Sequence, residues 1–285
     1  MKRRLRAIGI VLSVLGVAIA APKGPVARYK VLPPVTHGNF ALFPVVGETS
    51  FNTQQFLTLD EGIASGQVIV TERSQTSGLV WPRRPRPRIW PEPPIEIPRS
   101  GASVNELVLI NDSDRPLILL AGEIVTGGKQ DRLISKDRIV RPHSERIALR
   151  VFCVEPRRWR ETSAQFGGLS FSMAQPSLRR KAMAEQNQHE VWNEVARSRA
   201  AFSAKLNAPE ARVVAGSSSY AMAVQNGAVQ QQIDSIAAPV DESYRKMIQR
   251  LRAEKAVGAV VAINGEPIWE DVFASHHCSK NIGPS

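Results

Sequence analysis

The sequence predicts an α+β fold with a mostly antiparallel, β-sandwich-like core. The main observation is a series of apolar segments in residues 104–155, separated by short polar or glycine-containing turns, which is typical of a meander of strands. A second observation is Asn264-Gly265, a strong hairpin signal, between two apolar segments near the C-terminus. A third is helical periodicity in residues 178–253, which predicts helices that cover the sheet faces.

The chain begins with the pattern of a secretory signal peptide. Four basic residues lie before residue 7, and an apolar run over residues 7–20 ends in Ala18-Ile19-Ala20. This run is shorter than the roughly 20 apolar residues that a membrane-spanning helix needs. We therefore expect cleavage after Ala20, a periplasmic or secreted location, and no stable membrane anchor after cleavage.

Size and charge limit the class of protein. Cleavage would leave 265 of the 285 residues, enough for one large domain, which we place at residues 35–274. The formal charge of +11 falls to +7 once the four basic residues of the signal are removed. Much of the remaining positive charge lies in one proline-rich stretch and not on a face interleaved with aromatic residues, so we expect no nucleic-acid binding.

Strands and one short helix are predicted before residue 73. Residues 29–46 read as a first strand pair, with its apolar part at residues 40–46. A short helix follows at residues 57–66, where Thr58 and Glu61 have the spacing of a capping box and Gly66 suits a helix C-terminus. Residues 67–72 return to β character.

A proline- and arginine-rich segment interrupts the strands at residues 73–103. Residues 81–94 carry too many prolines for a regular backbone ladder, so an extended surface loop is predicted. The alternative is an arm, residues 81–98, that binds a protein partner.

The central stretch predicts most of the core. Apolar strands are expected at residues 107–110, 117–121, 123–125, 139–140 and 147–154. Gly127-Gly128 permits positive φ and a close approach of backbone amides to charged neighbours.

Helices are predicted after residue 176. One long helix over residues 178–206 carries Val191, Val195, Phe202 and Leu206 on one face. Residues 216–219 read as a polar linker, and a second amphipathic helix follows Pro239. The final strands are expected at residues 257–263 and 268–273.

Two blocks of this sequence resemble a known family. Residues 117–132, and Phe152-Cys153-Val154-Glu155 followed by Trp159, are similar in order and spacing to the ARG and rhodanese-phosphatase superfamily associated domain. The similarity continues at residues 188–192 and 257–263. Arg157 departs from it, since the family usually has glycine there. The resemblance implies a fold but no established reaction or catalytic residue, so the catalytic residues are unknown.

The sequence contains other patterns that resemble functional sites, but from none of them do we predict a cofactor or a metal site. The glycine turn has no Ser or Thr after Lys129 and no helix pattern behind it, which excludes a phosphate-binding loop of the nucleotide-hydrolase type. Cys153 lies in an apolar strand and reads as a buried small side chain. His276-His277-Cys278 are adjacent, a poor arrangement for one ion. Residues 275–285 also depart from the family, and we expect them to result from a frameshift.

What remains is a polar constellation at predicted strand ends. We expect an anionic ligand to meet the Lys129, Arg132 and Arg158 cations, with a carboxyl of Glu123 or Glu155 as acid or base. The alternative is an internal ion network, for instance between Arg132 and Glu155. The candidate ligand-binding residues are Glu123, Gly127, Gly128, Lys129, Gln130, Asp131, Arg132, Glu155, Arg158 and Trp159.

Two functions fit these observations. One is an exported binding or scaffold module of the cell envelope with a pocket for an anionic small molecule. The other is an enzyme that acts on a phosphate- or ribose-bearing, nucleotide-derived small molecule. The absence of a triad or metal motif in the sequence favours the module.

Overall fold

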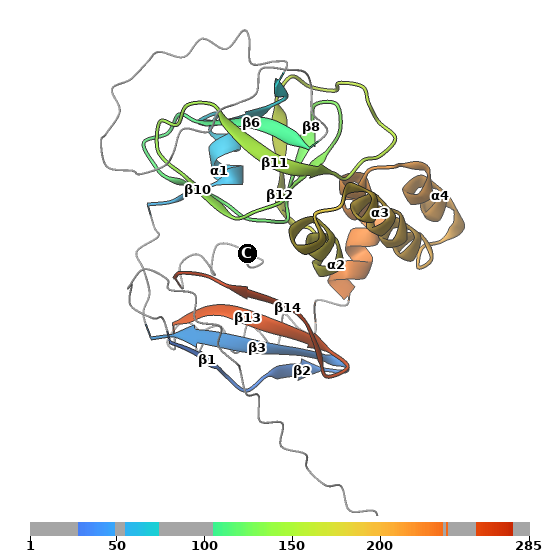
Figure 1. Cartoon of the computed structure of the whole chain (residues 1–285). Helices are drawn as coiled ribbons and strands as arrows, with labels where there is room; N and C mark the ends of the chain where they lie inside the picture. Colours follow the sequence, from blue (N-terminus) through green and yellow to red (C-terminus); the bar gives the residue numbers. More distant parts are fainter. Residues whose placement is uncertain (1–27, 49–54, 74–104, 236–237, 239–254, 276–285) are drawn as a thin grey trace, which may run out of the picture.

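A computed structural model describes residues 28–48, 55–73, 105–235, 238 and 255–275. It confirms the α+β class, with strands that are mostly antiparallel. Figure 1 shows a curled β body, a group of helices on one side of it, and a separate sheet made from both ends of the described chain. The signal peptide, the segment 81–98, the second amphipathic helix and the C-terminal tail that the sequence predicted lie outside the described residues.

The β body is a six-stranded antiparallel sheet that curls until its outer strands meet. Its order is β12-β8-β9-β11-β6-β5. Thr71 on β5 forms a bridge with Gln165 beside β12, and its hydroxyl donates to the Ala164 carbonyl at 2.8 Å, so the sheet is closed like a barrel. The strands are β5 (Val68–Thr71), β6 (Glu106–Asn111), β8 (Glu123–Gly127), β9 (Arg132–Ile134), β11 (Ile147–Cys153) and β12 (Phe166–Met173).

A short second sheet closes one side of this body. It has the order β10-β7-β4, formed by β4 (Leu57–Thr58), β7 (Leu117–Leu119) and β10 (Arg138–Val140). The predicted capping box is present at α1 (Leu59–Ala64), where the Thr58 hydroxyl accepts from the Glu61 amide and the Glu61 carboxylate accepts from the Thr58 amide. Gly66 follows with φ +70°, as its predicted position required.

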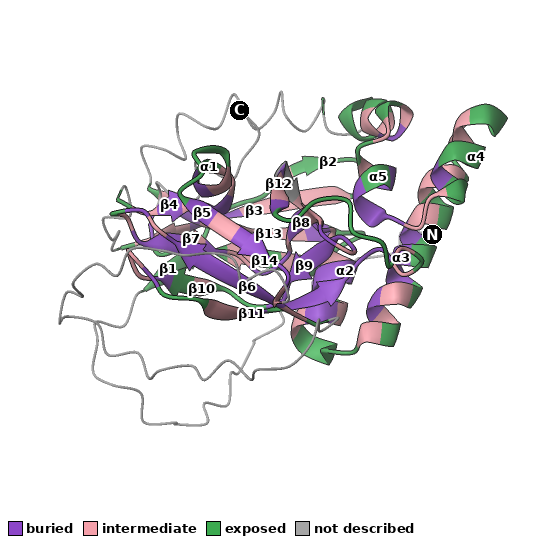
Figure 2. Cartoon of the chain, turned by 90° about the horizontal axis from the view of Figure 1, so that it is seen from above, coloured by how far each residue is buried: buried purple, intermediate pink, exposed green. Residues whose placement is uncertain are grey.

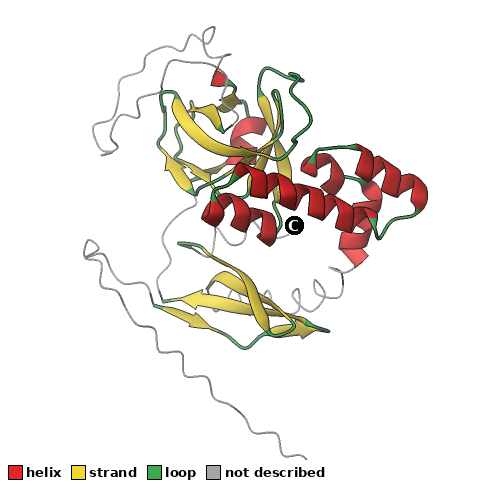
Figure 3. Ribbon diagram, turned by 45° about the vertical axis from the view of Figure 1, so that its right-hand side comes forward, coloured by secondary structure: helices red, strands yellow, loops and turns green. Residues whose placement is uncertain are grey.

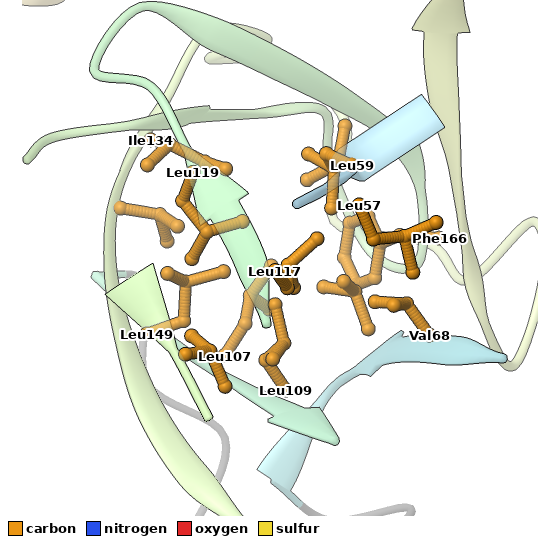
Figure 4. Packing of buried hydrophobic residues seen from close by; sticks show 14 residues of the cluster. Leu57, Leu59, Val68, Leu107, Leu109, Leu117, Leu119, Ile134, Leu149 and Phe166 are labelled. Atoms are coloured by element: carbon orange, nitrogen blue, oxygen red, sulfur yellow. The ribbon is translucent and has the colours of Figure 1, made fainter. Parts of the chain in front are cut away.

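The largest hydrophobic cluster fills the space between the two sheets. Figure 4 shows Leu117 near the middle of it, with Leu107 and Leu109 of β6 close by and Phe166 of β12 at its edge. Alternate strand residues point inward, which is why the apolar runs of the central stretch supply it. Its buried members are Leu57, Leu59, Val68, Val70, Leu107, Leu109, Leu117, Leu119, Val125, Ile134, Val140, Leu149, Val151 and Phe166.

The helices cover the outer face of β8, β9 and β11. A second cluster joins Ile124, Leu133 and Phe152 of these strands to Leu178 and Val195 of the helices. Figure 3 shows the helices gathered on this side of the strands, and Figure 2 shows that they bury one face and expose the other. They are α2 (Pro176–Arg180), the π-helix η2 (Lys181–Glu185), α3 (Gln188–Ser203), α4 (Ala208–Gly216) and α5 (Tyr220–Val224).

A third sheet combines strands from both ends of the described chain. β1 (Tyr29–Val31) and β2 (Val35–His37) pair with β3 (Phe40–Gly47), which pairs along its length with β13 (Ala256–Ile263). β14 (Glu266–Val272) completes the sheet through the predicted hairpin, where Asn264 and Gly265 have φ +55° and +82°. Both central residues thus have the positive φ of a type I′ turn.

Two predictions about this architecture were wrong. The central strands do not form a simple meander, because β6 pairs with β11 and β5 while β7 leaves for the short sheet. The helix predicted at 178–206 is broken at Gln186, which has φ +49°, and Asn187 then caps α3. A separate helix, α4, begins at Ala208-Pro209, since proline suits the first turn of a helix. Among the described residues, no helix is long and apolar enough to cross a membrane.

Candidate functional site

The pairing of β9 with β11 brings the two sequence blocks together. Arg132 lies opposite Cys153, and the Val154 amide donates to the Asp131 carbonyl at 3.0 Å. The glycine turn before β9 and the corner after β11 therefore meet at one end of the strand pair. Residues 127–132 and 155–159 are thus neighbours in space although they are separated in the chain.

Gln130 and Glu155 hold this corner closed. The Gln130 amide nitrogen donates to the Glu155 carbonyl oxygen at 2.9 Å, and the Asp131 amide donates to the Glu155 carboxylate at 3.1 Å. Both side chains are buried. Since every one of these bonds crosses between the two blocks, they fix the corner as a unit.

Asp131 is the centre of the network. Its carboxylate accepts from the Gly127 amide at 3.1 Å, from the Ser219 hydroxyl at 2.7 Å and from Arg158 at 3.2 Å. Burial raises the pKa of Asp131; the Glu155 charge adds to this, while Ser219, Gly127 and Arg158 oppose it. The donors thus offset part of the cost of burying this carboxyl.

Arg158 pairs with both carboxylates. Its guanidinium lies 2.6 Å from Glu155 and 3.2 Å from Asp131, and it also donates to the carbonyls of Gly127 and Gly128. Burial lowers the pKa of Arg158, but the two carboxylates outweigh it and the net change is a rise. The side chain remains 19% exposed, so its charge is partly accessible.

Arg132 lies inside the body and not at the surface. It is fully buried, donates to the Gln130 side-chain oxygen at 3.0 Å, and lies 3.7 Å from the Glu72 carboxylate. Burial lowers the pKa of Arg132, opposed by Cys153, Glu72 and Asp131. The same Glu72 oxygen accepts from the Lys129 amide at 3.2 Å, so Arg132 and Glu72 together support the glycine turn from below.

The accessible part of the cluster is its rim, which we define as Lys129, Arg158 and Trp159. The Lys129 ammonium lies 5.2 Å from the centre of the Trp159 ring, within cation–π range. Trp159 is 51% exposed, although tryptophan side chains are highly buried on average. The rim therefore presents two cations and an aromatic face to solvent.

Gly128 permits this turn for a steric reason as well as a conformational one. It has φ +50°, and a Cβ atom there would lie 2.2 Å from the Phe166 ring. The turn is thus pressed onto the barrel core, and its amides are held where Ser163 and Asp131 accept from them.

Glu123 is not part of this cluster. It lies at the opposite end of β8 from Gly127, where its carboxyl accepts from the Leu120 amide at 2.7 Å. Burial raises the pKa of Glu123 to about 8, with the Asp60 and Asp137 charges adding to the effect and the Leu120 bond opposing it. It titrates near neutrality, but away from the rim.

Cys153 has the packing role that the sequence predicted. It is free and buried, and burial raises the pKa of its thiol, which disfavours the nucleophilic thiolate. The Gln188 side chain donates to its carbonyl and accepts from its amide, both at 2.9 Å, and so ties α3 to β11. Among the residues that the structure describes, no group of three His, Cys, Asp or Glu is placed to hold a metal ion.

A groove of about 490 Å³ lies elsewhere, between α3 and α4. None of the ten candidate residues lines it. Its lining is Ala196, Arg199, Ala200, Ser203, Ala204 and Ala215.

Two residues of the network were not predicted from the sequence. Ser219 was read as part of a polar linker, but it caps α5 and donates to Asp131 while being fully buried. The signal that could have found it is the Ser219-Tyr220 step, where an N-cap residue precedes an apolar turn. Glu72 has no such signal, because its partner Arg132 is reached only through the pairing of distant strands.

Comparison with known proteins identifies the family. The model of the ARG and Rhodanese-Phosphatase-superfamily-associated Protein domain matches residues 28–284, a range that includes the tail after residue 275. Neither the curated proteins nor the solved structures contain a match. The family match includes both blocks that form the corner described above. The chain therefore belongs to the ARG and Rhodanese-Phosphatase-superfamily-associated Protein domain family.

Proposed function

We propose that this protein is an exported binding module of the cell envelope that takes an anionic small molecule at the rim of Lys129, Arg158 and Trp159. The observation that carries the proposal is the exposed Trp159 ring with the Lys129 ammonium beside it. An exposed aromatic face next to cations suits a ligand with a planar group and a phosphate or carboxylate.

The buried network supports the rim and leaves Lys129 available to the ligand. Arg132 and Gln130 are occupied inside the body, so they set the shape of the turn. Arg158 is partly neutralised by Glu155 and Asp131, which leaves Lys129 as the cation that contributes most to the anion. Rigid support of this kind lowers the ordering cost of binding.

Ligand screening by thermal shift tests the proposal directly. Nucleotides, ADP-ribose and sugar phosphates are the probes, and a ligand that binds the folded state raises the melting temperature further as its concentration exceeds its Kd. We expect Trp159→Ala and Lys129→Ala each to weaken the best binder about tenfold by calorimetric titration, with melting temperatures close to that of the parent chain. Lys136→Ala, an exposed lysine in the turn after β9, is the matched control.

Arg132→Ala tests the supporting network apart from the ligand site, because it should change stability. It removes the Arg132 cation from the buried Glu72 carboxylate, and we expect a loss of about 3–5 kcal/mol in the free energy of unfolding. If Trp159→Ala and Lys129→Ala bind every probe as the parent does, the rim is not the site and the cluster acts only as an internal network.

An enzyme acting on a phosphate- or ribose-bearing molecule is the second candidate. Glu155 is the carboxyl of the cluster nearest the rim, at 2.6 Å from Arg158. Turnover of any probe that binds, followed by its loss in Glu155→Gln, would favour this function over simple binding.

A further inference from the structure

Arg179 lies in a socket at the far end of β8 from the rim. It belongs to α2 and is only 6% exposed. Its side chain crosses Gly122, where a Cβ atom would lie within 2.7–2.8 Å of three Arg179 atoms. Gly122 also has φ +102°, so both backbone and space at this position require glycine.

The partners of Arg179 come from the C-terminal hairpin. Its two terminal nitrogens donate to the two oxygens of Asp271, each at 2.9 Å. Its guanidinium also lies 4.0 Å from the centre of the Trp269 ring. Bidentate pairing combined with stacking is the strongest recognition that arginine offers a carboxylate.

The geometry of β14 makes this contact directional. Trp269 and Asp271 are both half-buried, whereas Ile268, Glu270 and Val272 between and beside them are exposed. Trp269 and Asp271 therefore lie on the face of β14 that contacts Arg179 of α2, and Figure 1 shows where the two elements lie. On the neighbouring strand β13, Val261 lies opposite Trp269 and Ala259 lies opposite Asp271.

Among the described residues of the sheet that contains β14, Val45, Val257 and Ala262 are buried apolar side chains. None of the three hydrophobic clusters of described residues includes a member of the sheet formed by β1, β2, β3, β13 and β14. The Arg179 contact is a polar link, seen among the described residues, between this sheet and the body.

We propose that Arg179 and Gly122 form a carboxylate-binding latch, and that the β1–β3–β13–β14 sheet docks on the body by placing Asp271 in it and can detach as a folded unit. Asp271 is 40% exposed at its side chain, so water and salt reach the ion pair. Detachment would break the pair and the stacking while leaving the strand pairs of the sheet intact.

Quenching of Trp269 fluorescence tests the latch in the full-length chain. The signal of Trp269 is obtained by comparing each protein with the same protein carrying Trp269→Phe. In Asp271→Asn we expect the acrylamide quenching constant of Trp269 to rise about threefold, because the ring loses the guanidinium that covers it. Arg179→Lys keeps the positive charge but cannot donate two parallel hydrogen bonds to Asp271, so the quenching constant should rise by an intermediate amount.

Hydrogen exchange distinguishes detachment from unfolding. If the sheet leaves as a unit, the amides of β13 and β14 keep their protection in Asp271→Asn. Glu270→Gln, the exposed neighbour on the same strand, should leave both measurements unchanged. An unchanged quenching constant in Asp271→Asn would overturn the latch. A rise in quenching together with faster hydrogen exchange in β13 and β14 would also overturn it, because the sheet would then unfold and not detach.

Discussion

Ser219 shows how one hydroxyl can serve both a helix and a buried carboxylate. It donates to Asp131 and accepts from the Met222 amide at 3.0 Å. Ser219→Ala removes both bonds, and we expect the free energy of unfolding to fall by about 2–3 kcal/mol in urea titrations. Ser218→Ala, in the same serine run, is the control. Equal stability of the two variants would mean that Asp131 has no need of this donor.

Glu123 should make stability depend on pH. Its pKa rises from the ordinary 4.5 to about 8 in the folded protein, so between these values the folded state holds a proton that the unfolded state releases. The free energy of unfolding therefore decreases as pH rises through this window, by about 1–2 kcal/mol after allowance for solvent screening.

Glu123→Gln tests this directly, because glutamine keeps the acceptor for the Leu120 amide but does not titrate. We expect the decrease in unfolding free energy between pH 5 and pH 8 to be smaller in this variant than in the parent chain. Glu266→Gln, an exposed carboxyl on β14, should keep the parent's slope. A Glu123→Gln profile that overlays the parent's would show that Glu123 is ionised throughout.

At the scale of elements, the Gln188 side chain forms the two backbone hydrogen bonds that a neighbouring strand would otherwise form with Cys153 of β11. Its amide group satisfies both the amide and the carbonyl of Cys153, so the start of α3 is fixed to the edge of β11. Gln188→Ala leaves these backbone groups unpaired, and we expect a loss of about 1–3 kcal/mol in unfolding free energy by denaturant titration. Asn193→Ala, on the exposed side of α3, serves as the control; a similar loss there would point to helix propensity instead.

Local signals predicted the elements whose structure is local. The capping box at Thr58, the hairpin at Asn264-Gly265 and the apolar runs of the barrel all follow from side-chain chemistry within a few residues. The break at Gln186 was missed because a positive φ is uncommon for a non-glycine residue; the local signal that could have indicated it is Asn187, which caps α3.

Pairing between distant strands was the harder part. The alternation in β6 and β7 is compatible with their being neighbours, yet β6 pairs with β11, and the barrel closes through Thr71 and Gln165. The same limit applies to the candidate site: the two blocks were found, but Glu72 and Ser219 reach them only through the closed barrel and the helix layer.

For the whole molecule, export is the expectation with the sharpest test. Expression of the full-length chain in a bacterium with a periplasm should give a mature protein whose first residue is Ala21, as shown by N-terminal sequencing of the periplasmic fraction. Substituting a charged residue in the apolar run, for example Val14→Glu, should retain the precursor in the cytoplasm. A full-length chain found only in the cytoplasm would remove export from the proposed function.

The sheet that joins the two ends of the described chain also governs when folding can finish. β3 precedes the barrel in the chain, yet its long partner β13 is made only after the barrel strands and the helices. Until then one edge of an apolar strand has nothing to bond with, and such an edge invites association with other chains. Chains truncated before residue 256 should therefore aggregate more than the full-length chain. A chaperone that covers β3 during synthesis should increase the amount of folded full-length protein.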